Sequence, residues 1–192
     1  MEFAFVKEAV DILNHKPRVN DMKNLMLFLR ESNAIENVWD ELSLTYARAA
    51  WDYLIKKKKL TVKTILRTHA ILMHDKLDPE ETGAYRKRPV YIGGHEAKKW
   101  YVIPDLMDQW YKTANGTIKL AETGFRGSGV NSIEEMIKDD HIAFEAIHPF
   151  IDGNGRIGRI IMNWQRDKVD KILPILVIKE SEKWDYYSWF TH

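Results

Sequence analysis

Residues 148 to 159 contain most of the side chains in this sequence that are suited to chemistry on phosphate groups. The segment reads HPFIDGNGRIGR and combines a histidine, an aspartate, an asparagine, glycines and two arginines. Pro149 disfavours a helical backbone at the preceding residue, so a helix before it is expected to end at His148 and leave the imidazole at its exit. His148 is therefore the candidate general base, able to take a proton from a hydroxyl that attacks phosphorus.

The glycines and arginines of the same segment predict a polyphosphate site. Gly153 and Gly155 let backbone N–H groups approach a ligand closely, and a helix that begins there directs free N–H groups at the same place. Arg156 and Arg159 lie three residues apart, so both project from one side of the first helical turns toward successive phosphates. Asp152 offers a hard oxygen ligand for Mg²⁺. The chemistry indicated is phosphoryl or nucleotidyl transfer.

Two other interpretations explain this segment less well. Gly153, Gly155 and Gly158 also fit the dinucleotide-binding pattern G-x-G-x-x-G, with Glu180 near the distance expected of a ribose-binding acid. That pattern needs a buried strand before it, whereas the preceding DDHIAFEAIHPF has helical spacing, and too little chain follows Glu180 to complete a sheet. A plain turn with surface arginine ion pairs explains the mixture of residue types less well than the phosphate site does.

The elements that position this segment are predicted to be mainly helical. Apolar residues recur three or four apart over several stretches, as one helix face demands. The part of the chain from Pro79 to Pro104 changes to Gly, Pro and β-branched or aromatic residues, which predicts a β-hairpin or flap with Gly93 and Gly94 after its first strand. An aromatic tail from Trp184 to Trp189 is expected to pack on the core. The expected helices are Asn33 to Leu54, Val62 to His74, Asp105 to Leu120, Asn131 to Ile147 and about Gly155 to Lys168.

Length and composition indicate one globular domain of 192 residues, with 45% hydrophobic and 30% charged residues. Lys and Arg (29) nearly balance Asp and Glu (28), so no attraction to nucleic acid or to an anionic membrane is expected. The chain has no cysteine, which suits a reducing compartment. No leader and no apolar stretch long enough for a membrane span is seen, so a cytoplasmic location is expected.

The segment from His148 to Arg159 resembles the signature of the Fic family (filamentation induced by cyclic AMP), H-P-F-x-[DE]-G-N-G-R-x-x-R, and matches every fixed position. GAYRKRPVYIGG at Gly83 to Gly94 is similar to the flap of that family. The resemblance implies a single-domain helical core with a short β-hairpin flap and an N-terminal inhibitory helix. The expected parts are an N-terminal inhibitory region at about 20–60 and a catalytic core at about 61–192, with the flap at 83–103.

The resemblance also implies an activity: transfer of AMP from ATP to a Ser, Thr or Tyr hydroxyl of a protein, with Mg²⁺. A branch that transfers phosphate has lysine where this chain has Gly155, which disfavours phosphate transfer, whereas use of another nucleotide stays open. Self-modification and assembly into a homo-oligomer, both frequent in the family, stay open too. The implied roles are general base for His148, Mg²⁺ ligand for Asp152, anion hole for Gly153, Asn154 and Gly155, phosphate binding for Arg156 and Arg159, core anchor for Phe150, and docking of an extended target segment for Val90, Tyr91, Ile92 and Gly93.

Residues Ser32 to Asn37 match the inhibitory pattern of the family, [ST]-x-x-x-E-[GN]. The resemblance implies that Glu36, supported by Ser32, pairs with Arg159 and keeps the γ-phosphate of ATP from seating. A capping box formed by Asn33 and Glu36 at the start of the long helix is the structural alternative. Other functional interpretations are an enzyme that removes AMP with the help of Glu36, and a nucleotide-binding regulator that transfers nothing.

Overall fold

Polar caps set where several helices begin in the computed structural model, which describes residues 19–129, 132–171 and 173–190. The side chains of Asp40, Thr61 and Ser132 each accept a hydrogen bond from a backbone N–H in the first turn, at 2.8, 3.2 and 3.2 Å. Such caps satisfy N–H groups that have no partner within the helix. The α-helices before the C-terminal segment are α2 (Val19–Ile35), α3 (Glu41–Leu54), α4 (Val62–Leu72), α5 (Ile103–Glu122), α6 (Ile133–Ile147) and α7 (Asn154–Val169).

The predicted continuous helix from Asn33 to Leu54 is wrong, because the chain turns between α2 and α3. Asn37 has a left-handed backbone with φ of 57°. Its N–H donates to the carbonyl of Ala34 at 2.9 Å, and the N–H of Val38 donates to the carbonyl of Asn33 at 3.0 Å. This pair of bonds is a Schellman motif, which ends a helix. Asn33 and Glu36 therefore lie at the end of α2, and the capping-box interpretation is wrong as well.

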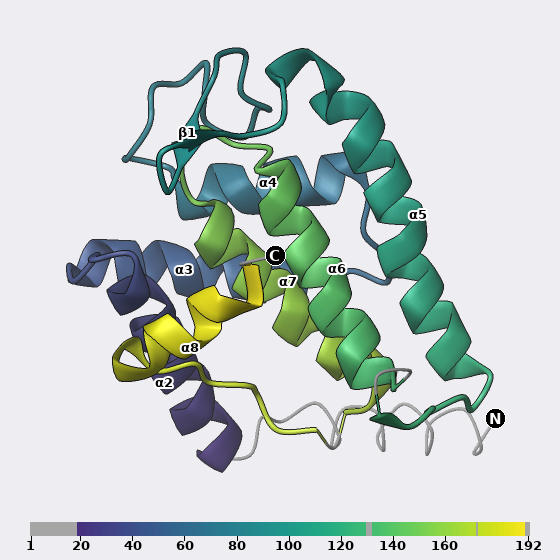
Figure 1. Ribbon diagram of the computed structural model, residues 1–192. Coiled ribbons are helices and arrows are strands. Elements are labelled where there is room, and N and C mark those ends of the chain that lie inside the picture. The colour runs from purple at the N-terminus through teal and green to yellow at the C-terminus, as the bar shows by residue number, and fades with distance from the viewer. Residues whose placement is uncertain (1–18, 130–131, 172, 191–192) are drawn as a thin grey trace, which may run out of the picture.

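Helix α7 lies at the centre of the fold and contacts α2, α3, α4, α5 and α6 (Figure 1). Nearly all of its first three turns is buried, which explains why the apolar residues of this helix do not form a single stripe. Helices α5 and α6 pack on one another, α3 packs on α4, and α2 packs on α3. Large side chains at the core include Phe28, Leu54, Ile65, Phe144 and Trp164.

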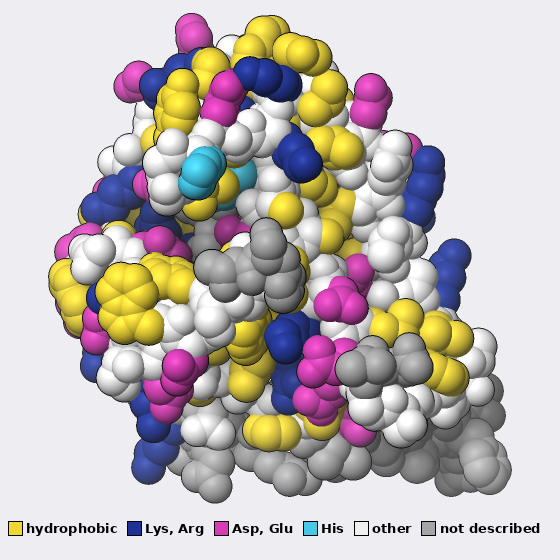
Figure 2. Space-filling model, viewed as in Figure 1, with side chains coloured by type: hydrophobic (Ala, Val, Ile, Leu, Met, Phe, Trp, Pro, Cys, Tyr) yellow, Lys and Arg dark blue, Asp and Glu magenta, His cyan; other side chains and the backbone are white. Residues whose placement is uncertain are grey.

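The predicted β-hairpin is confirmed between α4 and α5. Strand β1 (Tyr91–Ile92) pairs antiparallel with β2 (His95–Glu96), with Tyr91 opposite Glu96. The two residues of the turn, Gly93 and Gly94, have φ of 54° and 85°, which glycine adopts without strain. The hairpin side chains are exposed, and Figure 2 shows apolar side chains interspersed with Lys and Arg at this end of the molecule.

The chain after α7 crosses back over α2. It continues through the 3-10 helix η3 (Glu180–Glu182), the short helix α8 (Lys183–Tyr187) and the 3-10 helix η4 (Ser188–Phe190). The backbone N–H of Glu180 donates to Glu31 of α2 at 2.6 Å. The dinucleotide interpretation is therefore wrong. A helix and not a strand precedes Gly153, and Glu180, which begins η3, packs against α2.

The aromatic tail packs on the core only in part, since Tyr186 is buried whereas Trp184 is exposed. No helix in the described part of the chain is long and apolar enough to cross a membrane.

We expect Thr61→Ala to lower the free energy of unfolding by about 1 kcal/mol, the usual effect of removing an N-cap side chain. The hydroxyl of Thr61 accepts from the N–H of Thr64, and the Thr64 hydroxyl accepts from the N–H of Thr61 at 2.7 Å. Urea denaturation measures the change. Thr113→Ala, on the exposed face of α5, is the control and should change stability much less. Equal midpoints for Thr61→Ala and the parent protein would contradict this role of the cap.

Candidate active site

His148 ends α6 with a left-handed backbone, φ 51° and ψ 63°, as the following proline predicted for a helix boundary. Its N–H donates to the carbonyl of Phe144 at 3.0 Å. Burial lowers the pKa of the imidazole below its ordinary value, and the positive charge of Arg86 lowers it further. The Nδ1 atom is buried without a hydrogen-bond partner among the described residues. At neutral pH the ring is therefore uncharged and able to accept a proton.

The loop between His148 and α7 is held closed by the side chain of Asn154. Its Oδ1 accepts from the N–H of Phe150 and its Nδ2 donates to the carbonyl of Phe150, both at 2.9 Å. The side chain of Asn154 is thus committed to the loop, and its backbone is what remains for an anion. Gly153 precedes α7 with φ of 81°, and a Cβ there would lie 2.8 Å from Sδ of Met73. Glycine at this position is required by both the backbone and the space.

Asp152 and Arg156 form an ion pair at the N-terminal end of α7, 3.2 Å between Oδ2 and NH2. The Asp152 side chain is 61% exposed, whereas that of Arg156 is 4% exposed, and the Nε of Arg156 has no partner among the described residues. No cluster of three or more His, Cys, Asp or Glu side chains suited to a metal occurs in the described ranges. A cation held by Asp152 would therefore take its other ligands from water or a bound phosphate, as Mg²⁺ commonly does.

Arg159 is buried in the first half of α7 and contacts Glu36 across 123 residues of sequence. Its NH2 lies 2.7 Å from Oε1 of Glu36, and the Arg159 side chain is 1% exposed. Ser32 receives two further bonds from the same guanidinium, 2.9 Å from Nε to the hydroxyl and 2.8 Å from NH2 to the carbonyl. Ser32 thus supports the pair through Arg159. The structure brings together the two segments that the sequence singled out.

Gly155 makes room for this ion pair. A Cβ on Gly155 would collide with Oε1 of Glu36 and would lie 3.0 Å from NH1 of Arg159. The pattern around Glu36 also has a physical basis in the end of α2. Glu36 occupies the last position before the left-handed residue Asn37, a conformation that favours Gly or Asn.

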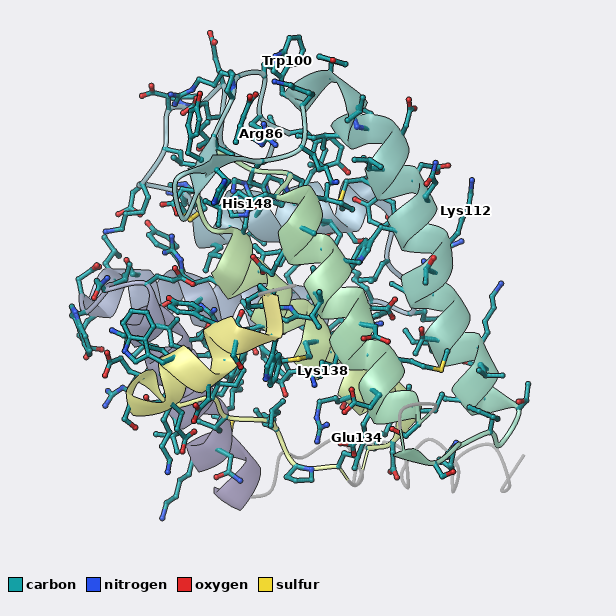
Figure 3. All side chains as sticks on the ribbon, in the orientation of Figure 1. Arg86, Trp100, Lys112, Glu134, Lys138 and His148 are labelled. Atoms are coloured by element: carbon teal, nitrogen blue, oxygen red, sulfur yellow. The ribbon has the colours of Figure 1, made fainter. Side chains whose placement is uncertain are left out.

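Arg86 joins the flap to the candidate base, a role that the sequence did not indicate. Its buried guanidinium donates to the carbonyl of His148 at 2.8 Å, to that of Lys98 at 2.5 Å and to that of Arg88 at 3.1 Å. The N–H of Arg86 also donates to the carbonyl of Pro149 at 3.0 Å. Figure 3 shows Arg86 above His148 at the hairpin end of the molecule. Arg86 stands among other basic residues in the sequence, and nothing in that pattern marks it as the buried one.

His69 of α4 makes a second connection between the flap and the phosphate loop. Its Nδ1 accepts from the N–H of Gly83 at 2.9 Å, so the proton lies on Nε2, which donates to the carbonyl of Asp152 at 3.0 Å. The ring stacks on Phe150 with centroids 3.9 Å apart. Burial lowers the pKa of His69 to about 4, which keeps this tautomer neutral.

A buried polar cluster lies behind Arg159, and the sequence pattern did not indicate it. NH1 of Arg159 donates to the hydroxyl of Tyr186 at 3.1 Å, and that hydroxyl lies 2.9 Å from Nε2 of His141. Glu145 is one turn further along α6, and burial raises its pKa to about 8, although the charge of Arg159 opposes this shift. A Cβ on Gly158 would meet both Glu145 and His141, so glycine lets α6 and α7 approach closely.

Comparison with known proteins identifies relatives that are similar in sequence or in fold. A sequence model of the Fic/DOC family matches residues 59–165. Proteins called protein adenylyltransferase Fic from Drosophila ananassae and Drosophila persimilis are each 30% identical over 148 residues, 77% of this chain. The aligned part is 27% and 26% of those proteins, so the chain spans about a quarter of the length of the curated relatives it matches.

Solved structures confirm the expected fold. A Fic-domain-containing signaling protein from Bacteroides thetaiotaomicron has a TM-score of 0.71 at 19% identity, covering 91% of this chain and 76% of the other. A Fic family protein from Desulfovibrio desulfuricans has a TM-score of 0.71 at 23% identity, covering 93% and 59%. The mainly helical core with a short hairpin is common to them.

We expect Arg86→Lys to loosen the flap while leaving the helical core folded. A lysine cannot reproduce three separate guanidinium bonds to carbonyl groups, and buried hydrogen bonds of charged groups contribute roughly 1.5–3 kcal/mol each. Hydrogen exchange read by mass spectrometry should show faster exchange in residues 88–98 and unchanged exchange in α6 and α7. Arg88→Lys is the matched control, because Arg88 pairs with Glu81 at the surface. Unchanged exchange in the flap of Arg86→Lys would show that the hydrogen bonds of Arg86 do not hold the flap in place.

Glu145→Gln should change how stability depends on pH. The folded protein keeps the Glu145 proton up to about pH 8, whereas the unfolded chain loses it near the ordinary pKa of 4.5. The stabilisation is therefore complete below pH 4.5 and is lost as the pH rises toward 8. We expect Glu145→Gln to gain stability relative to the parent protein by up to about 1.4 kcal/mol per pH unit in this window. Urea denaturation of both proteins across the window tests this, and a constant difference would refute the shift.

Proposed function

Because this chain belongs to the Fic/DOC family, we propose that it transfers AMP from ATP to a Ser, Thr or Tyr hydroxyl of a target protein. The observation that carries the proposal is a neutral, half-buried imidazole, His148, shortly before the N-terminal end of α7, whose first turns carry two buried arginines, Arg156 and Arg159. The names of the Drosophila relatives support the same chemistry.

His148 acts as the general base in this proposal. The target hydroxyl loses its proton to the imidazole as its oxygen bonds to the α-phosphorus of ATP. The bond from that phosphorus to the bridging oxygen breaks, and pyrophosphate leaves with the electron pair. The lowered pKa of His148 supports this role, because an imidazole that is already neutral can accept the proton.

The polyphosphate lies over the start of α7, where the backbone N–H groups of Asn154 and Gly155 form the anion hole together with that of Gly153, which donates to Oδ1 of Asp152 until a phosphate takes its place. Arg156 and Arg159 bind the phosphates, and the unpartnered Nε of Arg156 supports this assignment, since a buried donor calls for an acceptor. Asp152 is the residue that would hold Mg²⁺, and its exposed carboxylate fits a metal that takes most of its ligands from elsewhere. When bound, Mg²⁺ neutralises charge on the phosphates.

The flap docks the target. Strand β1 and its neighbours, Val90, Tyr91, Ile92 and Gly93, align an extended target segment by strand addition, which fixes the hydroxyl through backbone hydrogen bonds. Exposure of both strands supports this assignment, because a two-stranded hairpin leaves edges available for pairing. The hydrogen bond from Arg86 to the carbonyl of His148 then keeps the docked segment at a fixed distance from His148.

Glu36 is the brake in this proposal. Its carboxylate takes an N–H of Arg159 that the γ-phosphate needs, so ATP seats productively only when the carboxylate leaves. The pairing distance of 2.7 Å and the burial of Arg159 support a strong interaction. An ion pair is stronger where a partner is shielded from water than where both partners are at the surface.

We expect Glu36→Gly to raise AMP transfer at least about tenfold, which corresponds to about 1.4 kcal/mol of released inhibition. The protein, Glu36→Gly and Glu36→Gly with His148→Ala are incubated with Mg²⁺ and ATP, UTP, GTP or CTP, and intact mass reports self-modification. One added AMP in Glu36→Gly, lost with His148→Ala, is the expected result. Equal adduct in the parent protein and in Glu36→Gly would contradict the brake.

The same experiment separates the other interpretations. An adduct from another nucleotide would change the donor, and an adduct that persists without His148 would remove it as the base. Removal of AMP is tested with AMP-modified target. Release by the parent protein that is lost in Glu36→Gly would mean that Glu36 serves hydrolysis.

A further inference from the structure

Arg159 has five N–H donors, and the structure assigns partners to most of them. Nε donates to the Ser32 hydroxyl, NH2 donates to the Ser32 carbonyl and to Glu36, and NH1 donates to the hydroxyl of Tyr186. Ser32 and Glu36 both belong to the end of α2, so their contacts depend on the position of that helix end. Tyr186 comes from α8, and its contact with the guanidinium does not involve a residue of α2.

The contact from Tyr186 has a defined direction. Arginine has no acceptor, so the Tyr186 hydroxyl accepts from NH1 and must give its own proton to another group. Nε2 of His141, 2.9 Å away, is that acceptor. His141 is uncharged at neutral pH because burial lowers its pKa to about 3, and in the tautomer that accepts from Tyr186 the ring proton is on Nδ1 and the lone pair is on Nε2. The donors run in one direction from Arg159 through Tyr186 to His141.

Residues of α6 and η4 fix the position of Tyr186. Tyr186 is 3% exposed, and its ring packs against His141 and Phe190 with centroids 5.8 and 5.1 Å apart. The guanidinium carbon of Arg159 lies 5.3 Å from the centre of the same ring. Both the hydroxyl and the ring of Tyr186 therefore bear on Arg159, and neither contact needs Glu36.

We propose that Tyr186, backed by His141, is a positioning residue that keeps Arg159 aimed at the terminal phosphate of ATP once Glu36 has left. This inference rests on the proposed function. Without Tyr186, a guanidinium released by Glu36 regains rotational freedom and loses part of its alignment, which lowers the affinity for a triphosphate. Bonds to the first two phosphates do not use Arg159 in this arrangement, so a diphosphate is bound as before.

The test compares nucleotide affinities by calorimetry with Mg²⁺ present. The nucleotides are ADP and an ATP analogue whose α–β bridging oxygen is replaced by methylene, which prevents transfer. The proteins are the parent protein, Glu36→Gly, Glu36→Gly with Tyr186→Phe, and Glu36→Gly with Tyr187→Phe. Tyr187 is the matched control, because it lies on the same helix and its hydroxyl donates to the carbonyl of Ile35 at 3.4 Å.

We expect Tyr186→Phe to weaken the triphosphate about tenfold, a change of about 1.4 kcal/mol, and to leave ADP within about twofold. Tyr187→Phe should leave both affinities unchanged. An unchanged triphosphate affinity in Tyr186→Phe, or an equal loss for both nucleotides, would overturn the inference. The proposed brake fails by a different result, namely that Glu36→Gly binds the triphosphate no more tightly than the parent protein.

A second variant covers the case in which Tyr186→Phe does not fold. His141→Phe keeps a ring at this position and removes the acceptor of the Tyr186 proton. In the Glu36→Gly background it should show the same selective loss for the triphosphate. Equal affinities with and without His141→Phe would then overturn the inference.

Discussion

The buried guanidinium of Arg159 is the constraint on which the rest of the site depends. A charge in the interior is tolerated only when it is paired and its hydrogen bonds are made, and the partners of Arg159 come from both ends of the chain. Helix α2 supplies Ser32 and Glu36, and α8 supplies Tyr186. The need to satisfy one cation thus brings the N-terminal and C-terminal segments onto the central helix α7, and the same cation is the group that a phosphate is proposed to take.

Placement of the site on α7 gives it a rigid support, and the flap forms a separate part of the site. The helix is surrounded by other helices, so its N-terminal end is fixed by the packing of the core. The flap is exposed and rests on that core through Arg86 and His69, which bind carbonyl groups of the loop from His148 to Asp152. Both contacts are made with backbone carbonyl groups of that loop.

The sequence predicted the elements around the site better than the contacts that position them. The spacing from His148 to Arg159 was sufficient to predict a helix end, a loop and the start of the next helix, and Gly93 and Gly94 located the hairpin. The helical period continued through Asn37, where the left-handed backbone and the cap at Asp40 prevail over the apolar pattern. Arg86 and Tyr186 could not be found in this way, because burial of a polar side chain depends on segments far away in sequence.

The Schellman end of α2 has a consequence for how the proposed brake would release. Glu36 is held where it is by the winding of the last helical turn, and Asn37 closes that turn. Helix ends fray at a small energetic cost compared with global unfolding. The Glu36 carboxylate can therefore withdraw by local unwinding of α2 while the other helices stay folded. The proposed inhibition would then depend on the same equilibrium as fraying of this helix end, and a partner that binds the end of α2 would hold Glu36 on Arg159.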